Sequence, residues 1–283
     1  AKVDNYYIIK TTKQQQQQTK ENTMLQFSKA NAKLGKLYKV EELDQWLTDN
    51  RKVYSLDLLS GWSCPFADEC LSKVHETGEI SKAGNPKVKL KDGKNTKYRC
   101  FSASQEVLFP SLYKLRKGNF DALRGMSLDE MIYHLNDKLP ENAGIIRIHV
   151  AGDFFSADYM QAWYSVAKMN PNILFYAYTK SLPYWDSVVN DMGTLENFVL
   201  TASRGGRADS LISELGLSST TVVFSESQAN ISGLEIDSDD SHAARPDLRN
   251  QDFALLIHGV QPKGSEASKA LSALKGKGSY SRA

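Results

Sequence analysis

The sequence predicts an α/β protein built on a parallel sheet, a partial (β/α)6 barrel of six strands with N-terminal additions. Six short apolar segments recur from residue 53 onward, and most connections between them read as helices. Polar side chains also alternate with apolar ones in several of these strands. Such alternation suits a barrel with a polar lumen better than a sheet covered by helices on both faces. An open doubly wound sheet is the alternative.

Each element follows from its local pattern. The predicted strands cover residues 53–60, 145–150, 173–179, 198–203, 220–225 and 253–259. Helices are predicted over residues 40–49, 102–118, 127–139, 156–170 and 208–216, with a short helix near 183–191. Ser127 should begin its helix, because Glu130 stands at the capping-box spacing. We expect residues 76–97 to form a long exposed loop with a possible hairpin.

The chain divides into an N-terminal arm and the barrel. Residues 1–52 form the arm, with a possible strand at 1–10, five glutamines at 14–18 and the helix at 40–49; residues 53–283 form the barrel. The net charge of +2 gives no reason to expect a nucleic-acid partner. No apolar run is long enough to span a membrane, and the first residues lack a signal-peptide layout, so we expect no membrane partner and a cytoplasmic location.

The three cysteines fall in one stretch of the sequence. Cys64 and Cys70 follow the first predicted strand, with five residues between them, and Cys100 comes 30 residues after Cys70. An odd number of cysteines argues against a disulfide framework. Three thiolates can hold a [4Fe-4S] cluster and leave one iron open to another ligand. The alternative is a zinc ion completed by a histidine such as His75 or His149.

Polar side chains gather toward the carboxyl ends of the predicted strands, where ligands of parallel α/β folds bind. Arg147 and His149 share one strand face, and Ile146, Ile148 and Val150 share the other. The groups predicted to face the site, and to bind or act on a small-molecule ligand, are Arg147, His149, Asp153, Tyr178, Lys180 and Arg204.

Each of these residues also has a structural interpretation. His149 could be the fourth iron ligand or a hydrogen-bonded core histidine, and Asp153 could bind iron or an ammonium group, or cap the next helix. Lys180 could hold an anion or lie in solvent, and Arg147 could pair with Asp57. The turn from Ser203 to Arg207, with two glycines and two arginines, could bind an anion or be a plain turn. The acidic loop from Asp237 to His242 is expected to be solvated rather than a metal site.

Part of this pattern resembles the radical-SAM barrel. A first strand leads into a cysteine loop, and a second strand ends in Ala151-Gly152-Asp153 before an amphipathic helix. The resemblance implies a partial barrel with a [4Fe-4S] cluster on Cys64, Cys70 and Cys100. It also implies that Gly152 and Asp153, with Arg147 and Tyr178 nearby, contact the bound cofactor. The cysteine spacing departs from the C-x3-C-x2-C of that family, so the resemblance extends to fold and cluster further than to S-adenosylmethionine.

Longer blocks resemble a family of poorly characterised bacteriophage proteins, some described as iron–sulfur proteins. These blocks are SCPFADECLSKV, RCFSASQE, RIHVAGDFF, FYAYTKSLPYW and DFALLIHGVQPKGS, within residues 55–265. The resemblance implies a phage-encoded cluster protein in the host cytoplasm, and we expect an enzyme acting on a small molecule at the open iron. The alternatives are a redox sensor without catalysis, a protein that engages a host protein, a structural zinc protein, or a hydrolase using Ser203 with His149 or His258.

Overall fold

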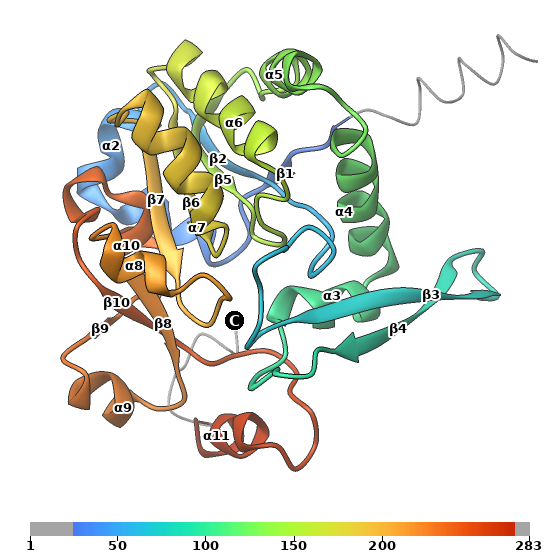
Figure 1. Cartoon of the computed structure of the whole chain (residues 1–283). Coiled ribbons are helices and arrows are strands. Elements are labelled where there is room, and N and C mark those ends of the chain that lie inside the picture. Colours follow the sequence, from blue (N-terminus) through green and yellow to red (C-terminus); the bar gives the residue numbers. More distant parts are fainter. Residues whose placement is uncertain (1–24, 275–283) are drawn as a thin grey trace, which may run out of the picture.

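A computed structural model of the protein describes residues 25–274, which form one large sheet, a separate hairpin and surrounding helices (Figure 1). The large sheet has the strand order β1-β2-β5-β6-β7-β8-β10-β9. Its strands are β1 (Ser28–Lys29), β2 (Lys52–Leu56), β5 (Ala143–Ile148), β6 (Leu174–Thr179), β7 (Phe198–Ser203), β8 (Ser219–Val223), β9 (Glu235–Ile236) and β10 (Phe253–Leu256).

The six predicted strands are all present, and they lie side by side in the order of the sequence. β2, β5, β6, β7, β8 and β10 pair in parallel, as the alternation of strands and helices predicts. Two short edge strands were not predicted: β1 pairs antiparallel with β2, and β9 pairs with β10. Within residues 25–274, β1 and β9 are the two edges of the sheet and do not pair with each other. The sheet described by these residues is therefore not closed into a barrel.

The helices largely match the predicted ones, and one predicted helix is broken in two. The predicted helix 102–118 is two helices, because Pro110 begins a new one after the extended residue Phe109. Ser127 and Glu130 form the predicted capping box. The helical segments are η1 (Leu34–Lys39), η2 (Glu41–Leu43), α2 (Asp44–Leu47), α3 (Phe101–Leu108), α4 (Pro110–Leu123), α5 (Leu128–Asp137), α6 (Ala157–Met169), α7 (Leu182–Trp185), η3 (Asp186–Asn190), α8 (Ser210–Glu214), α9 (Glu226–Ile231), α10 (Ser241–Ala244), η4 (Pro246–Leu248) and α11 (Glu266–Leu274).

Each face of the sheet packs against a different part of the chain. Ile146 and Ile148 of β5 share a hydrophobic core with α4, α5 and α6, as their strand parity predicts. On the opposite face, Ile145 of β5 packs against Leu34 and Leu37 of η1, together with η2 and α10. The sheet face that was predicted to line a lumen is therefore covered, around Ile145, by η1, η2 and α10. The predicted strand at residues 1–10 and the glutamines at 14–18 lie outside the described residues.

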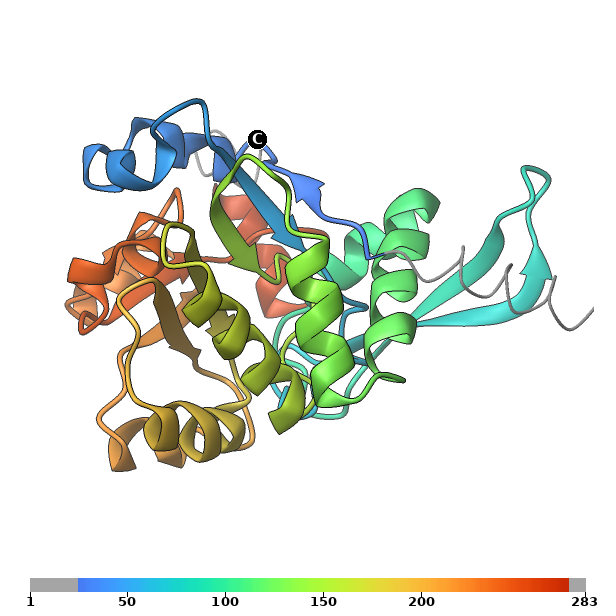
Figure 2. The ribbon, with the colours of Figure 1, turned by 90° about the horizontal axis from the view of Figure 1, so that it is seen from above.

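The segment predicted as a loop with a possible hairpin is a two-stranded antiparallel ribbon. β3 (Ser72–Ile80) pairs with β4 (Pro86–Asp92), and the ribbon projects from the body of the molecule as an arm (Figures 1 and 2). Val74 is buried at its base, and Val88 and Leu90 pack against the same core. Because Cys70 precedes β3 and Cys100 follows β4, the arm is inserted between the second and third cysteines.

Candidate functional site around three cysteines

Cys64 and Cys70 lie in the loop that follows β2, as the sequence predicts. The backbone N–H of Gly61 donates a hydrogen bond to Sγ of Cys64, at 3.3 Å. Gly61 has φ +70°, and a Cβ there would come within 2.3 Å of the Ser72 carbonyl oxygen, so glycine is required for this close approach. The loop also rests on the segment after β7, where Ala67 and Gly206 form an isolated bridge.

Cys100 reaches the same place from the other end of the arm. It occupies the N-cap position of α3, where the nearby backbone N–H groups of Ala103 and Ser102 lower the pKa of its thiol against the larger effect of burial. Ser72 joins the two cysteine segments: its hydroxyl accepts the N–H of Cys100, at 3.3 Å, and donates to Asp92, at 2.9 Å. The same hydroxyl lies 3.4 Å from the carbonyl oxygen of Cys70.

The three thiols therefore converge, and we call them the thiol site. Burial raises the pKa of all three, to about 11 for Cys100, and the charges of neighbouring thiols raise the pKa of Cys64 and Cys100 further. The cysteines are unpaired, and each keeps some exposed surface. Among residues 25–274, no group of three or more His, Cys, Asp or Glu side chains is arranged so that it could hold a metal ion.

Asp153 is close enough to the thiol site to affect it. Its charge raises the pKa of both Cys64 and Cys70. Its carboxylate accepts hydrogen bonds from the hydroxyl of Thr179, at 2.6 Å, and from the backbone N–H groups of Lys180 and Phe154. Burial raises the pKa of Asp153 to about 6 in spite of these bonds. It therefore links the ends of β5 and β6, whereas Ser156 caps α6.

Gly152 lies at the closest contact between the end of β5 and the cysteine loop. It has φ +95°, and a Cβ there would come within 2.7 Å of both Leu58 Cβ and the Ser63 hydroxyl oxygen. The requirement for glycine is thus explained by packing against residues just before Cys64. Contact with a cofactor stays a prediction for this residue.

Lys180 extends from the end of β6 to the end of β7. Its ammonium group donates to the hydroxyl and carbonyl oxygens of Ser203, at 2.7 and 2.9 Å, and to the carbonyl oxygen of Arg204, at 2.6 Å. The lysine is buried rather than solvated, and its charge lowers the pKa of Cys70. It thus places a positive charge beside the thiol site.

The turn predicted as a possible anion site already contacts a carboxylate. The N–H groups of Gly205 and Gly206 donate to the two carboxylate oxygens of Asp209, at 2.7 and 2.9 Å. Arg204 donates to the hydroxyl of Ser219, at 3.0 Å. The turn thereby holds the first residues of the loop before α8 and supports the cysteine loop.

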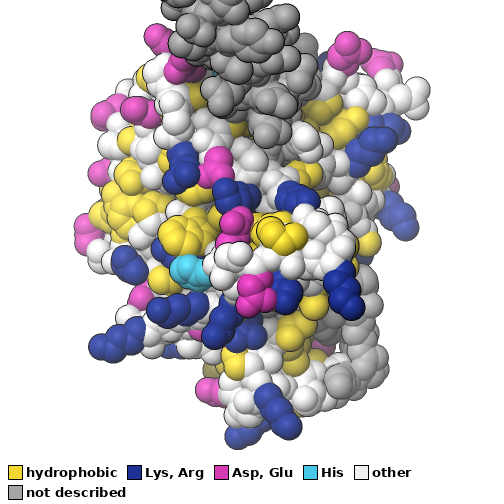
Figure 3. Space-filling model, turned by 90° about the vertical axis from the view of Figure 1, so that its right-hand side faces the viewer, with side chains coloured by type: hydrophobic (Ala, Val, Ile, Leu, Met, Phe, Trp, Pro, Cys, Tyr) yellow, Lys and Arg dark blue, Asp and Glu magenta, His cyan; other side chains and the backbone are white. Residues whose placement is uncertain are grey.

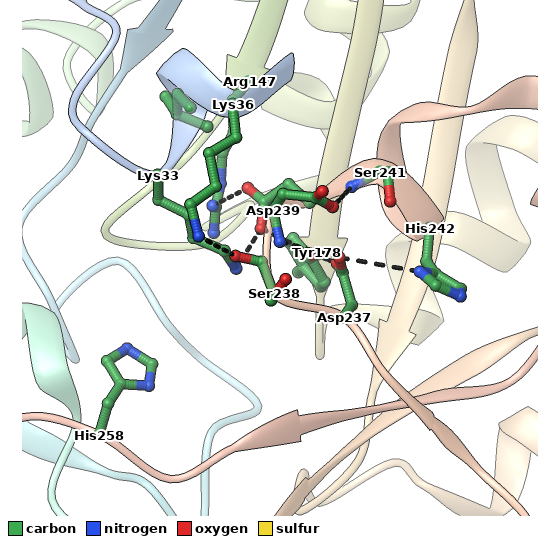
Figure 4. Close-up of polar contacts among 12 residues, drawn as sticks. Lys33, Lys36, Arg147, Tyr178, Asp237, Ser238, Asp239, Ser241, His242 and His258 are labelled. Atoms are coloured by element: carbon green, nitrogen blue, oxygen red, sulfur yellow. Dashed lines mark hydrogen bonds and ion pairs between the residues drawn. The ribbon is translucent and has the colours of Figure 1, made fainter. Parts of the chain in front are cut away.

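Arg147 and Tyr178 belong to a second polar cluster, beside the loop that contains Asp237 and Asp239 (Figure 4). Arg147 and Lys33 both pair with Asp240, and the hydroxyl of Tyr178 donates to Asp240, at 3.1 Å. Burial alone would raise the pKa of Asp240, but the charges of Arg147 and Lys33 lower it. The acidic loop expected to be solvated is thus partly buried, and the pairing of Arg147 with Asp57 that the sequence left open is replaced by pairing with Asp240.

His149 does not share the face of Arg147, contrary to the strand-parity prediction. It has φ +72°, which breaks the alternation after Ile148 and directs the ring toward α6. Nε2 lies 3.1 Å from the Tyr159 hydroxyl oxygen, and burial followed by the charge of Arg147 lowers the pKa of His149 to about 3. Its Nδ1 is buried without a hydrogen-bond partner.

The residues predicted for a serine hydrolase are not assembled into a triad. The Ser203 hydroxyl accepts from Lys180, His149 contacts Tyr159, and His258 packs on the ring of Phe101 with centroids 4.6 Å apart. His258 adjoins the start of α3, next to Cys100, and burial lowers its pKa to about 4. His75, the other histidine weighed for zinc, lies on the arm against Trp62.

Sequence reasoning missed a buried ionic network that positions the thiol site. Arg116 of α4 lies 3.3 Å from Glu106 of α3 and 3.8 Å from Asp57 after β2. Glu106 accepts both the N–H and the hydroxyl of Ser60, and Asp57 accepts the N–H of Val150. The network fixes the helix that follows Cys100 against the segment that leads to Cys64. The signal for this network in the sequence was the presence of Glu106 and Arg116 within the predicted helix 102–118.

Comparison with known proteins identifies a phage gene-product family. The Gene product 88 family matches residues 11–275, which include all three cysteines and the strands around them. The chain belongs to the Gene product 88 family. Like the family, a curated relative comes from a phage: the Gene 88 protein of Mycobacterium phage L5 is 29% identical over 90 residues, an alignment that covers 29% of this chain and 38% of that relative.

Family membership confirms the predicted phage resemblance and leaves the predicted cluster as a prediction. No solved structure matches this member of the Gene product 88 family, so the comparisons offer no structural neighbour for its fold. None of the helices formed by residues 25–274 is long and apolar enough to cross a membrane.

Proposed function

We propose that the thiol site binds a [4Fe-4S] cluster and that the protein is an enzyme acting on a small molecule beside it. The observation that carries the proposal is the convergence of Cys64, Cys70 and Cys100 at the carboxyl end of β2. Three thiolates can each bind one of the four irons, and the fourth iron would then keep an exchangeable ligand.

The surroundings of the thiols fit this group. The backbone N–H of Gly61 donates to the sulfur of Cys64, and hydrogen bonds to sulfur are one means by which proteins tune clusters. Lys180 places a positive charge beside Cys70, which favours its thiolate form.

Asp153 and Lys180 are the proposed polar groups of the site. Asp153, with a pKa of about 6, could hold a proton at neutral pH more readily than an ordinary aspartate. Lys180 would fix the end of β7 and offset negative charge beside the thiols. Arg204 supports the neighbouring turn, and His258 packs on Phe101, the residue after Cys100.

The test is anaerobic purification followed by iron and sulfide analysis and EPR of the reduced protein. We expect about four irons and four sulfides per chain. The Cys64→Ala, Cys70→Ala and Cys100→Ala variants should each lose most of this iron. Thr220→Val is the matched control, because Thr220 is buried in β8 and its hydroxyl has no hydrogen-bond partner, and this variant should keep its cluster.

Two results would contradict the proposal, and a third experiment separates its finer alternatives. Zinc without sulfide would replace the cluster by a structural metal, and full iron content in all three alanine variants would place the iron elsewhere. Addition of S-adenosylmethionine separates the finer alternatives: a perturbed EPR spectrum would support radical-SAM-like chemistry, and an unchanged spectrum would favour another ligand. A turnover screen at the intact cluster then tests the enzymatic part.

A redox sensor is the second candidate, and a specific observation favours it. Ser72 bonds to both cysteine segments and to the end of β4, so the base of the arm is tied to the thiol site. Hydrogen exchange of β3 and β4 with and without iron tests this candidate. Faster exchange after iron removal would support it, and identical exchange would leave the enzyme as the sole proposal.

A further inference from the structure

We propose that the arm formed by β3 and β4 binds the phosphate backbone of duplex DNA. The binding surface is one face of the ribbon, which we call the basic face. It consists of Lys73, His75, Lys87, Lys89 and Lys91.

The arm carries the chain's excess of positive charge. Residues 72–92 contain five lysines against three acidic residues, an excess of two positive charges, which equals the +2 of the whole chain. The rest of the chain is therefore neutral overall. A local excess of this kind on a projecting element is the electrostatic pattern of a nucleic-acid contact.

Strand register gathers the charges on one face. Lys73 lies directly opposite Lys91, and His75 lies directly opposite Lys89. Lys87 follows the same alternation and pairs with Glu79, at 2.7 Å. Like charges directly opposite each other, as in the pair of Lys73 and Lys91, destabilise an antiparallel pair. This arrangement costs stability in the isolated protein, and an anionic partner would relieve the cost.

The other face of the ribbon is fixed to the body, which leaves the basic face outward. Val74 is buried, and Val88 and Leu90 pack against the core shared with α3 and α4. The side chains of Lys87, Lys89 and Lys91 alternate with these apolar residues and are exposed. Figure 3 looks onto the side from which the arm projects and shows Lys and Arg side chains across much of it.

Trp62 anchors the base of the basic face. Its indole N–H donates to the carbonyl oxygen of Val74, at 2.8 Å, and its ring is 43% exposed. The Lys73 ammonium lies 4.6 Å from the centre of this ring, and the ring of His75 meets it edge-on at 5.0 Å. These contacts hold two basic groups in place before any ligand binds, which reduces the entropy lost on binding.

The shape of the arm favours duplex DNA among anionic partners. Alternate residues of a strand are about 7 Å apart, so Lys87, Lys89 and Lys91 form a row that can follow a line of phosphates. The major groove of DNA admits a two-stranded ribbon. An arm that projects from the body can enter such a groove, whereas a flat anionic membrane would meet its tip first (Figure 2).

The test measures binding of the full-length protein to a fluorescent duplex of about 20 base pairs, at salt concentrations from about 50 to 200 mM. The Lys87→Gln, Lys89→Gln, Lys91→Gln triple variant should bind about tenfold or more weakly at low salt. It should also reduce the slope of log affinity against log salt by about 2.7, because each neutralised phosphate contributes about 0.9.

The control carries the same loss of charge away from the arm. Lys29, Lys39 and Lys168 are exposed lysines outside the ribbon, and their triple glutamine variant should keep most of the wild-type affinity and slope. Equal weakening by both triple variants, or no duplex binding by the wild type at about 50 mM salt, would overturn the proposal. So would binding only to single-stranded DNA or only to anionic lipid vesicles.

Discussion

Replacing Arg116 by methionine tests whether the buried ionic network holds the thiol site together. Arg116 is 1% exposed, and its removal leaves the carboxylates of Glu106 and Asp57 buried without their cation. Removing one partner of a buried ion pair costs about 3–5 kcal/mol, because the other charge stays desolvated. We therefore expect Arg116→Met to lower the free energy of unfolding by about this amount at pH 7.

The structure also predicts how this loss of unfolding free energy changes with pH. Burial raises the pKa of Glu106 even with Arg116 present, and loss of the guanidinium would raise it further. A carboxyl group whose pKa is higher in the folded than in the unfolded protein loses stability as the pH rises. The deficit of Arg116→Met should therefore be smaller at pH 5 than at pH 7.

The assay is urea unfolding followed by circular dichroism. Arg124→Met is the matched control, because Arg124 ends the same helix but is 59% exposed in its pair with Asp121, and it should cost less than about 1 kcal/mol. In a double-mutant cycle, Glu106→Gln should offset part of the loss, with a coupling of about 0.5–3 kcal/mol. A loss below about 1 kcal/mol for Arg116→Met, or strict additivity, would refute the reasoning.

Two further predictions concern regions away from the thiol site. Ser127→Ala removes the half of the α5 capping box in which the hydroxyl accepts the N–H of Glu130, and should lower the free energy of unfolding by about 1 kcal/mol; an unchanged urea midpoint would show that this bond adds nothing. Asp237, 3.7 Å from Nδ1 of His242, and Glu235, 3.3 Å from Nε2, raise the pKa of that histidine. Its contribution to stability should be complete below about pH 6.5 and decline as the pH rises through the raised pKa. The unfolding free energy of His242→Gln should lack this decline, and identical pH profiles would contradict the assignment.

The sequence by itself determined the parallel strand order and the cysteine segments. Apolar runs separated by amphipathic helices allow few topologies, because crossovers between parallel strands are short and right-handed. The same rule places Cys64 and Cys70 at a carboxyl end of the sheet. The capping pair of Ser127 and Glu130 was equally readable, because it depends on residues three apart.

The tertiary structure decided what the polar residues do. A left-handed backbone at His149 reversed the strand parity, and no local pattern marks such a residue in advance. Arg147 pairs with Asp240 rather than with Asp57, because long-range folding brings α10 and the residue before it onto the sheet. Asp57 pairs with Arg116 instead. Net charge suggested no contact with nucleic acid, since a sum over the chain discards where charges lie. Only the pairing register of β3 and β4 could place the lysines on one face, because register depends on the turn and the core contacts of the hairpin.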